Sequence, residues 1–331
     1  MRCAVVGAGA WGTALSHVLA SNEHDVRLWA REPGVATSIN TKHENPVFLA
    51  GAQLARSLVA TTDLAEALAG AEVIVYATPS AHLRAVARAG AAFVSERAIV
   101  AVATKGIEEG TLALMTDVIT AEHPGRLVVA ISGPSFAVEV IANQPTAIVA
   151  ASANAAAAHC VQQALSNASL RVYTQRDVIG VELGGALKNV MAVATGIVEG
   201  VGLGFNSRAA LITRGLAEMT RLGVALGATP STFAGLAGLG DLVLTCTGSL
   251  SRNRAIGEEI GRGATLADAL AGKQTVAEGV VTAKSASRLA ERFDVEMPIV
   301  QMVNRILFEG HTARRAVAEM MTRELRPEQD A

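Results

Sequence analysis

A glycine-rich segment at the start of the chain constrains the fold more than any other feature. Gly7-Ala8-Gly9-Ala10-Trp11-Gly12 directly follows a short apolar run, residues 3–6, and opens a helical pattern. In this setting Gly7 makes a tight turn, Gly9 lets backbone N–H groups reach a pyrophosphate, and Gly12 lets helix and strand pack closely. A plain glycine turn is the alternative, but a strand before the motif and a helix after it favour dinucleotide binding.

Strand-like runs alternate with helical patterns through the first half of the chain. After residues 3–6, the runs are 26–29, 58–60, 73–77, 98–103, 127–131, 146–150 and 170–173. This alternation predicts a doubly wound, mainly parallel α/β sheet. Ligands bind beyond the carboxyl ends of such strands, so a site is expected at the loops 78–80, 105–108 and 132–137.

Beyond residue 175 the pattern becomes almost wholly helical. We therefore expect a nucleotide-binding domain at 1–176 and a helical domain at 177–331, with the boundary near Arg176. A chain of 331 residues is long enough to bury two such cores.

The residue after the second strand bears on which dinucleotide is bound. An NAD-specific site usually has an Asp or Glu here, which binds the ribose 2′-hydroxyl. This chain reads Trp29-Ala30-Arg31-Glu32. Arg31 stands where a guanidinium can meet a 2′-phosphate, which favours NADP(H); the alternative is a solvated surface arginine beside Glu32.

An apolar helical run at 178–198 is interrupted by a glutamate, a lysine and an asparagine: Glu182, Lys188 and Asn189. Glu182 and Asn189 share one helix face, and Lys188 lies a quarter turn away. A lysine in a partly dry site shifts its pKa readily, as a proton donor near neutral pH requires. The alternative is that Lys188 extends from a core helix to water.

A second polar group lies further along the helical half. Gly240-Asp241 is followed by Thr245 and then by Ser251-Arg252-Asn253. Ser251 is a good N-cap for a helix at 252–260, whose free N–H groups and arginine fork suit an anion. Alternatively, Arg252 pairs with Glu258 or Glu259 on its own helix.

Charge and cysteine content exclude several classes of protein. The chain has 28 basic and 30 acidic residues, intermixed, so no nucleic-acid-binding stripe is expected. Its three cysteines form no CxxC pair, which argues against a disulfide framework and against a metal site and fits a reducing cytoplasm. Residues 222–240 carry no charge, but Pro230 and repeated glycines make them a poor membrane span, so no membrane insertion is expected.

Several motifs, in one order along nearly the whole chain, resemble those of the bacterial NAD(P)-dependent glycerol-3-phosphate dehydrogenases. They are GAGAWGTAL at 7–15, KGIE at 105–108, SGPSFAVEV at 132–140, ELGGALKNV at 182–190, NSRAALITRGLAEM at 206–219, GLAGLGDLVLTCTG at 235–248, SRNR at 251–254 and AEGV at 277–280. The chain departs from the family at NPVFLAG, 45–51, where Ala50 replaces a usual proline.

The resemblance implies an N-terminal Rossmann domain and an all-helical C-terminal domain, as in 6-phosphogluconate dehydrogenase-like folds, with the substrate between them. It also implies a homodimer that reduces dihydroxyacetone phosphate to sn-glycerol 3-phosphate for phospholipid synthesis, with NADP(H) or NAD(H) as cofactor. On the family pattern Lys188 accepts or donates the proton and binds substrate together with Lys105, Gly133, Ser135, Asp241, Ser251, Arg252 and Asn253. Nucleotide positions, besides Gly7, Gly9 and Gly12, are Ala10, Trp11, Arg31, Lys105, Ala137, Arg252, Val276 and Glu278.

The chemistry of the residues agrees with that implication. Hydride addition to a ketone builds negative charge on its oxygen, and a nearby cation such as Lys188 stabilises this transition state. Asp241 is suited to orient Lys188, and Lys105 to add a second positive charge. Phosphate held by Arg252 and Asn253 positions the carbonyl.

Two other readings keep parts of this pattern. Dehydrogenases of 3-hydroxyacyl or 2-keto acid substrates also join such domains, and fold alone does not separate them. A substrate without phosphate, however, has no use for Arg252 at a helix start. A non-catalytic NADPH sensor needs neither Lys188 nor Asp241.

Overall fold

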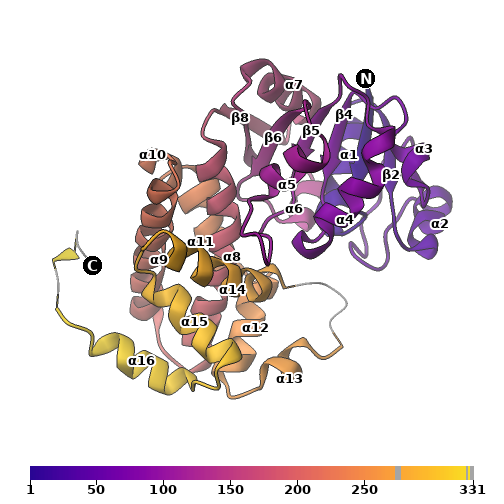
Figure 1. Ribbon diagram of the computed structural model, residues 1–331. Helices are drawn as coiled ribbons and strands as arrows, with labels where there is room; N and C mark the ends of the chain where they lie inside the picture. The colour runs from indigo at the N-terminus through magenta and orange to yellow at the C-terminus, as the bar shows by residue number, and fades with distance from the viewer. Residues whose placement is uncertain (273–276, 326, 329–331) are drawn as a thin grey trace.

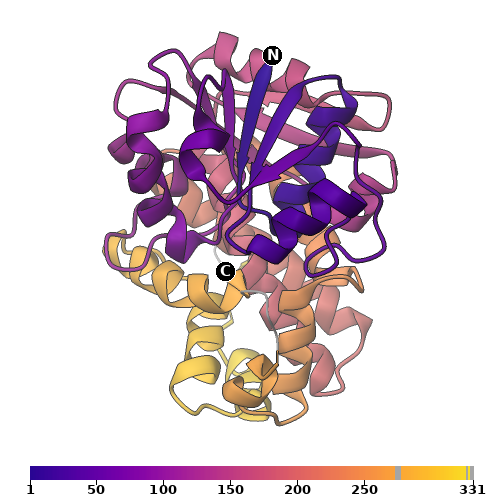
Figure 2. The ribbon, with the colours of Figure 1, turned by 90° about the vertical axis from the view of Figure 1, so that its right-hand side faces the viewer.

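The protein is described here by a computed structural model covering residues 1–272, 277–325 and 327–328. An α/β part built on one sheet sits against a part made of helices (Figure 1). In Figure 2 the α/β part lies above and the helical part below it.

The described residues form an eight-stranded sheet of order β3-β2-β1-β4-β5-β6-β7-β8. The strands are β1 (Arg2–Val6), β2 (Asp25–Trp29), β3 (Val59–Thr61), β4 (Val73–Tyr76), β5 (Ile99–Val102), β6 (Leu127–Ser132), β7 (Thr146–Ala151) and β8 (Leu170–Gln175). All eight predicted strands are present, with ends shifted by a residue or two. The β6–β7 pair is antiparallel and the other described pairs are parallel.

Helices cover both faces of the sheet. They are α1 (Ala10–Ser21), α2 (Pro33–Lys42), α3 (Leu64–Leu68), α4 (Ser80–Gly90), α5 (Met115–Glu122), α6 (Ala137–Ile141) and α7 (Ala155–Leu165), with a 3₁₀ turn, η1 (Ala91–Phe93). Each face buries its own apolar cluster. The central strands are buried on both sides because they have helices above and below, which explains their uninterrupted apolar sequence.

The strand order reverses between β1 and β4, since the chain builds outward from β1 in one direction and then from β4 in the other. Ligands of doubly wound sheets bind at this point, beyond the carboxyl ends of the strands. The glycine loop after β1 lies there. The predicted fold class is therefore confirmed.

The helical part is built around α8 (Val178–Gly200), which Asp177 caps by accepting a hydrogen bond from Gly180 N. Around it lie α9 (Phe205–Ala225), α10 (Pro230–Phe233), the π-helical turn η2 (Leu236–Gly240), α11 (Asp241–Thr247), α12 (Arg252–Gly261), α13 (Leu266–Leu270), α14 (Glu278–Arg292), α15 (Pro298–Phe308) and α16 (Ala313–Met321). Glycines let α8 and α12 touch backbone to backbone: a Cβ on Gly196 would lie 1.9 Å from Arg254 O, and one on Gly257 2.1 Å from Val193 O.

Among the described residues, α8 is the one helix long and apolar enough by itself to cross a membrane, and 83% of its apolar window is buried inside the fold. A bent pair, α10 to α11 with α12, passes the same test only when taken as one span. The apolar character of α8 is explained by its neighbours on all sides, because a helix buried in a helical core has little polar surface.

Candidate active site

Lys188 projects from the middle of α8 into a buried cluster of polar groups. Lys188 is 7% exposed. Its Nζ lies 2.5 Å from Asp241 Oδ1 and 2.8 Å from Thr245 Oγ1. Lys105 Nζ lies 2.8 Å from the other oxygen, Asp241 Oδ2. One fully buried carboxylate thus bridges two ammonium groups. Lys188 does not extend to water, so the alternative reading of this residue is wrong.

Burial and charge act on Lys188 in opposite directions. Burial lowers the pKa of Lys188 to about 8, the positive charge of Lys105 lowers it as well, and Asp241 raises it. Burial also raises the pKa of Asp241, but the two ammonium groups outweigh that effect and hold it below its usual value. Asp241 therefore stays ionised near neutral pH, while Lys188 is poised to exchange a proton there.

Close backbone packing brings these groups together. A Cβ on Gly184 would lie 2.3 Å from Ala237 O, so α8 meets η2 directly, and Asp241 begins α11 at the end of that turn. A Cβ on Gly185 would lie 2.6 Å from Ser132 Oγ and 3.5 Å from the Lys105 side chain. Glycines at these two positions of α8 admit η2 on one side and the loop after β5 on the other.

Thr245 is a member of this cluster that the sequence reading did not assign to the site. It follows Asp241 by four residues on α11, and its hydroxyl donates to Asp241 O at 2.6 Å while accepting from Lys188. Helix geometry predicts this placement, because residues four apart on a helix share one face, and Asp241 and Thr245 are four apart.

Glu182 and Asn189, also on α8, have separate partners. Glu182 accepts hydrogen bonds from Thr116 N at 2.8 Å and Thr116 Oγ1 at 2.5 Å, at the first turn of α5. Burial raises the pKa of Glu182 to about 7. Asn189 Oδ1 accepts from Asn253 Nδ2 at 3.0 Å.

The segment 251–253 begins α12 as expected, and Ser251 Oγ accepts from Arg254 N. Asn253 is tied within the helical part, since its Oδ1 also accepts from Gly279 N at 3.0 Å. Arg252 is exposed, and within the described part of the chain it makes no hydrogen bond or ion pair. The pairing with Glu258 does not form, because Glu258 bonds Arg254 and Arg262 instead.

The loop after β6 carries the next predicted positions. Gly133 has a φ of +136°, and a Cβ there would lie 2.9 Å from Ile148 Cα, so only glycine fits without strain. Ser135 Oγ donates to Gly133 O at 3.0 Å. Ala137 is the first residue of α6. The antiparallel strand β7 runs beside this loop, which is why the turn is tight.

The glycine loop has the shape that a dinucleotide requires. Gly7 has a φ of +116°, and a Cβ on Gly12 would lie 1.9 Å from Gly7 O. Above Gly9, by contrast, no described atom lies within 4 Å of the Cβ position. Gly9 caps α1 without a side chain, which leaves the N–H groups of Ala10 and Trp11 facing open space. Trp11 Nε1 is buried and has no hydrogen-bond partner among the described residues.

Other positions predicted to bind the nucleotide lie around this loop. Gly7 N donates to Trp29 O, which brings the end of β2 and the following Arg31 alongside. The Arg31 side chain is 73% exposed and bonds Glu32 Oε1. Glu278 accepts from Ser80 N at 3.0 Å and Ser80 Oγ at 2.6 Å, joining the start of α14 to the start of α4. Val276 lies outside the described residues.

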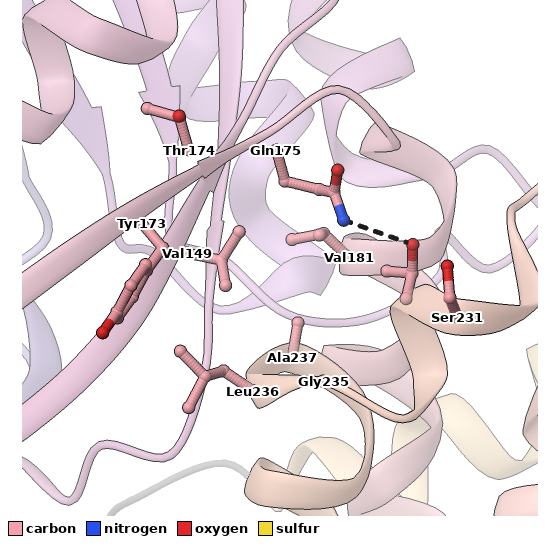
Figure 3. Close-up of a pocket in the computed structure, with 10 residues that line it drawn as sticks. Val149, Tyr173, Thr174, Gln175, Val181, Ser231, Gly235, Leu236 and Ala237 are labelled. Atoms are coloured by element: carbon pink, nitrogen blue, oxygen red, sulfur yellow. Dashed lines mark hydrogen bonds between the residues drawn. The ribbon is translucent and has the colours of Figure 1, made fainter.

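A pocket of about 130 Å³ opens elsewhere, between β8, α10 and η2 (Figure 3). Its described lining includes Thr174, Gln175, Ser231 and Leu236 and none of the predicted site residues. This lining makes it a cavity separate from the cluster of Lys188, Asp241 and Lys105. The described residues also hold no group of three or more His, Cys, Asp or Glu side chains suited to a metal ion.

Comparison with known proteins gives one consistent result. Two family models match: the NAD-dependent glycerol-3-phosphate dehydrogenase N-terminus over residues 2–158 and the corresponding C-terminus over 177–318. A glycerol-3-phosphate dehydrogenase [NAD(P)+] from Citrifermentans bemidjiense is 50% identical over 99% of this chain and 98% of its own, and one from Trichlorobacter lovleyi is 52% identical over 99% and 100%. The crystal structure of glycerol-3-phosphate dehydrogenase from Coxiella burnetii superposes with a TM-score of 0.94 at 39% identity, covering 97% of this chain and 99% of that one.

Proposed function

The chain belongs to the NAD-dependent glycerol-3-phosphate dehydrogenase family, and from this premise we propose how its residues carry out the reaction. It is an NAD(P)-dependent oxidoreductase that transfers a hydride reversibly between NAD(P)H and dihydroxyacetone phosphate, giving sn-glycerol 3-phosphate for phospholipid synthesis. The observation that carries the residue assignment is the buried bridge from Lys188 through Asp241 to Lys105.

Lys188 is the proton donor in the reductive direction. When bound, the nicotinamide cofactor supplies the hydride, and negative charge then grows on the carbonyl oxygen of the substrate. An ammonium group beside that oxygen supplies both charge and proton, and it does so in a site from which water is largely excluded. In the oxidative direction neutral Lys188 takes the hydroxyl proton.

Asp241, Thr245 and Lys105 hold Lys188 in position. Asp241 and Thr245 fix two of the three directions of the Lys188 ammonium, leaving its third N–H to meet the substrate. Lys105 adds a second charge at the substrate oxygen while sharing Asp241. Gly133 and Ser135 border the substrate from the loop after β6.

The substrate phosphate binds at the start of α12. The N–H groups of Arg252 and Asn253 make no hydrogen bond in the described part of the chain, and the ten-residue helix directs its positive end to this point. The Arg252 guanidinium is free to form a bidentate contact. Asn253 contributes mainly by fixing this helix start against Asn189 and Gly279.

The glycine loop would hold the cofactor, with the N–H groups of Ala10 and Trp11 beside Gly9 available to its pyrophosphate. Ala137, Glu278 and Arg252 would contact the rest of the cofactor, and Val276 belongs to the same set by the family pattern. NADP(H) is favoured over NAD(H) because the ion pair between Arg31 and Glu32 lies at the surface, where such pairs are weak. Arg31 can therefore give up Glu32 and bind a 2′-phosphate at little cost.

Residues 1–176 form the nucleotide-binding domain and 177–331 the substrate domain of a cytoplasmic protein that does not insert into membranes. The enzyme acts as a homodimer. Exposed apolar side chains on neighbouring elements of the helical part, Phe205 on α9 and Val243 on α11, support this assembly. Light scattering of the purified protein, which gives its mass in solution, tests it.

An assay of NADPH and NADH oxidation tests the function. Dihydroxyacetone phosphate is compared with a 2-keto acid and a 3-ketoacyl thioester as substrates. Turnover of the phosphorylated ketone, with the other two poor, is the expected result. Preference for either of the others would contradict the assignment.

A further inference from the structure

The connection between β5 and α5, residues 103–114, is the one segment of the α/β part that enters the core of the helical part in the described structure. Lys105 lies near its start, and Ile107 and Leu114 are buried in the same apolar cluster as Leu183 and Leu187 of α8. Gly106, with a φ of +147°, turns the chain between them. The position of the Lys105 ammonium therefore depends on how this segment is held.

Glu108, three residues after Lys105, is held by a fork from Arg84 on α4. Arg84 Nε and Nη2 each lie 2.7 Å from an oxygen of Glu108, and Thr111 Oγ1 donates to the same carboxylate. The Arg84 and Glu108 side chains are 29% and 15% exposed. A bidentate contact of this kind fixes direction as well as distance, which a single exposed ion pair does not.

Arg84 also bonds the last residue of α5. Its Nη1 lies 2.9 Å from Glu122 Oε1 on α5, the helix into which the segment leads. One guanidinium thus connects α4, the segment that carries Lys105, and α5. The neighbouring Arg88 bonds Glu122 as well, but it has no contact with Glu108 and its side chain is 69% exposed.

We infer that Arg84 is a positioning residue for the proposed reaction: by gripping Glu108 it fixes the segment that presents Lys105 to Asp241. Arg84 touches none of the proposed substrate or cofactor positions, so its effect passes through the backbone from Glu108 to Lys105. The inference rests on the proposed function, because it concerns the proton transfer at Lys188.

Loss of the fork has a consequence that general destabilisation lacks. When Lys105 moves away, Asp241 is left to Lys188 alone and the like charge is removed, so the pKa of Lys188 rises. The titratable groups that act on Lys188 from packed elements are Asp241 on α11 and Lys105 after β5. The nearby thiol of Cys246 stays uncharged, because burial raises its pKa to about 12. The pH profile of reduction is therefore expected to shift to higher pH.

Arg84→Gln is the test, with Arg88→Gln on the same helix as its matched control. We expect Arg84→Gln to lower kcat/KM for dihydroxyacetone phosphate by roughly 10- to 100-fold, the usual effect of misplacing a site by about an ångström, with the KM for NADPH unchanged. Arg88→Gln is expected to remain within about two-fold of wild type, since exposed pairs contribute little. The pH at which kcat/KM for reduction declines is expected to rise in Arg84→Gln and to stay unchanged in Arg88→Gln.

Glu108→Gln breaks the same fork from the other side and keeps the test informative if Arg84→Gln folds poorly. The double variant Arg84→Gln/Glu108→Gln is expected to lose no more than Arg84→Gln alone, because the contact between Arg84 and Glu108 is already absent from that variant. Arg84→Gln and Glu108→Gln matching Arg88→Gln in kcat/KM and in pH profile would overturn the inference. A wild-type enzyme without activity on dihydroxyacetone phosphate would instead refute the proposed function.

Discussion

Reduction of dihydroxyacetone phosphate is expected to slow as the pH rises through about 8, while oxidation of glycerol 3-phosphate speeds up over the same range. Burial, together with the positive charge of Lys105, lowers the pKa of Lys188 to about 8 against the opposing charge of Asp241. In the proposed mechanism, reduction needs the ammonium form of Lys188 and oxidation needs its neutral amine. The two directions therefore depend on the same titration with opposite sign.

The size of the effect follows from that pKa. One pH unit below it about 90% of Lys188 carries a proton, and one unit above it about 10% does, so kcat/KM for reduction falls ~10-fold between about pH 7 and pH 9. The substrate phosphate, with a pKa near 6, is already a dianion through this range. The profile of kcat/KM is the appropriate measurement because it reports on the free enzyme.

Two variants move the alkaline limb of this profile in opposite directions. Asp241→Asn removes the carboxylate that favours the charged lysine, so the limb moves to lower pH; Lys105→Met removes a like charge, so it moves to higher pH. Both variants also weaken the site and lower kcat/KM at every pH. The readout is therefore the pH at which kcat/KM for reduction declines, and not its maximum value. A limb that stays in place in both variants, or that survives in Lys188→Ala, would refute the assignment of the proton to Lys188.

Three further predictions concern other parts of the molecule. Arg31→Ala is expected to raise the KM for NADPH much more than that for NADH, and equal effects would mean that Arg31 faces solvent or the adenine. Arg252→Ala is expected to lower kcat/KM for dihydroxyacetone phosphate by ~10- to 150-fold, the worth of a charge-assisted contact, and scarcely to change the poor reaction of phosphate-free dihydroxyacetone; an equal proportional loss on both would assign Arg252 to cofactor or stability. The Glu182→Gln variant is expected to be more stable to heat than wild type at high pH, and the difference between the two grows as the pH increases. The raised pKa of Glu182, about 7, means that its contribution is fully present below about pH 4.5 and lost as pH rises through 7. The difference is roughly 1 to 3 kcal/mol at pH 8, and parallel melting curves from about pH 5 to pH 8 would show that Glu182 does not titrate there.

Local features of the sequence predicted the local structure well. The strand at 3–6, the glycine loop and the α1 helix appear where the pattern placed them, since each depends on neighbouring residues alone. Ser251 caps α12 for the same reason. The polar residues of α8 were correctly expected to need partners.

The identity of those partners was much harder to predict. Lys105 and Asp241 are 136 residues apart in sequence, and Glu182 and Thr116 are 66 apart. No periodicity encodes such a pairing, because it depends on how η2 and the loop after β5 meet α8. The family resemblance supplied Lys105 and Asp241; Thr245, which needed only helix geometry, was left out.

The charge of the buried cluster links its stability to its chemistry. Two ammonium groups share one carboxylate, so the group carries a net positive charge when both lysines are protonated. A buried net charge is unfavourable without a counter-ion, so the cluster releases the Lys188 proton at a lower pH, about 8, than an exposed lysine would. A substrate oxygen that becomes negative during reduction relieves the same imbalance, either as a counter-charge or by taking that proton. The arrangement is thus better suited to the transition state than to the free enzyme, which is the condition for catalysis.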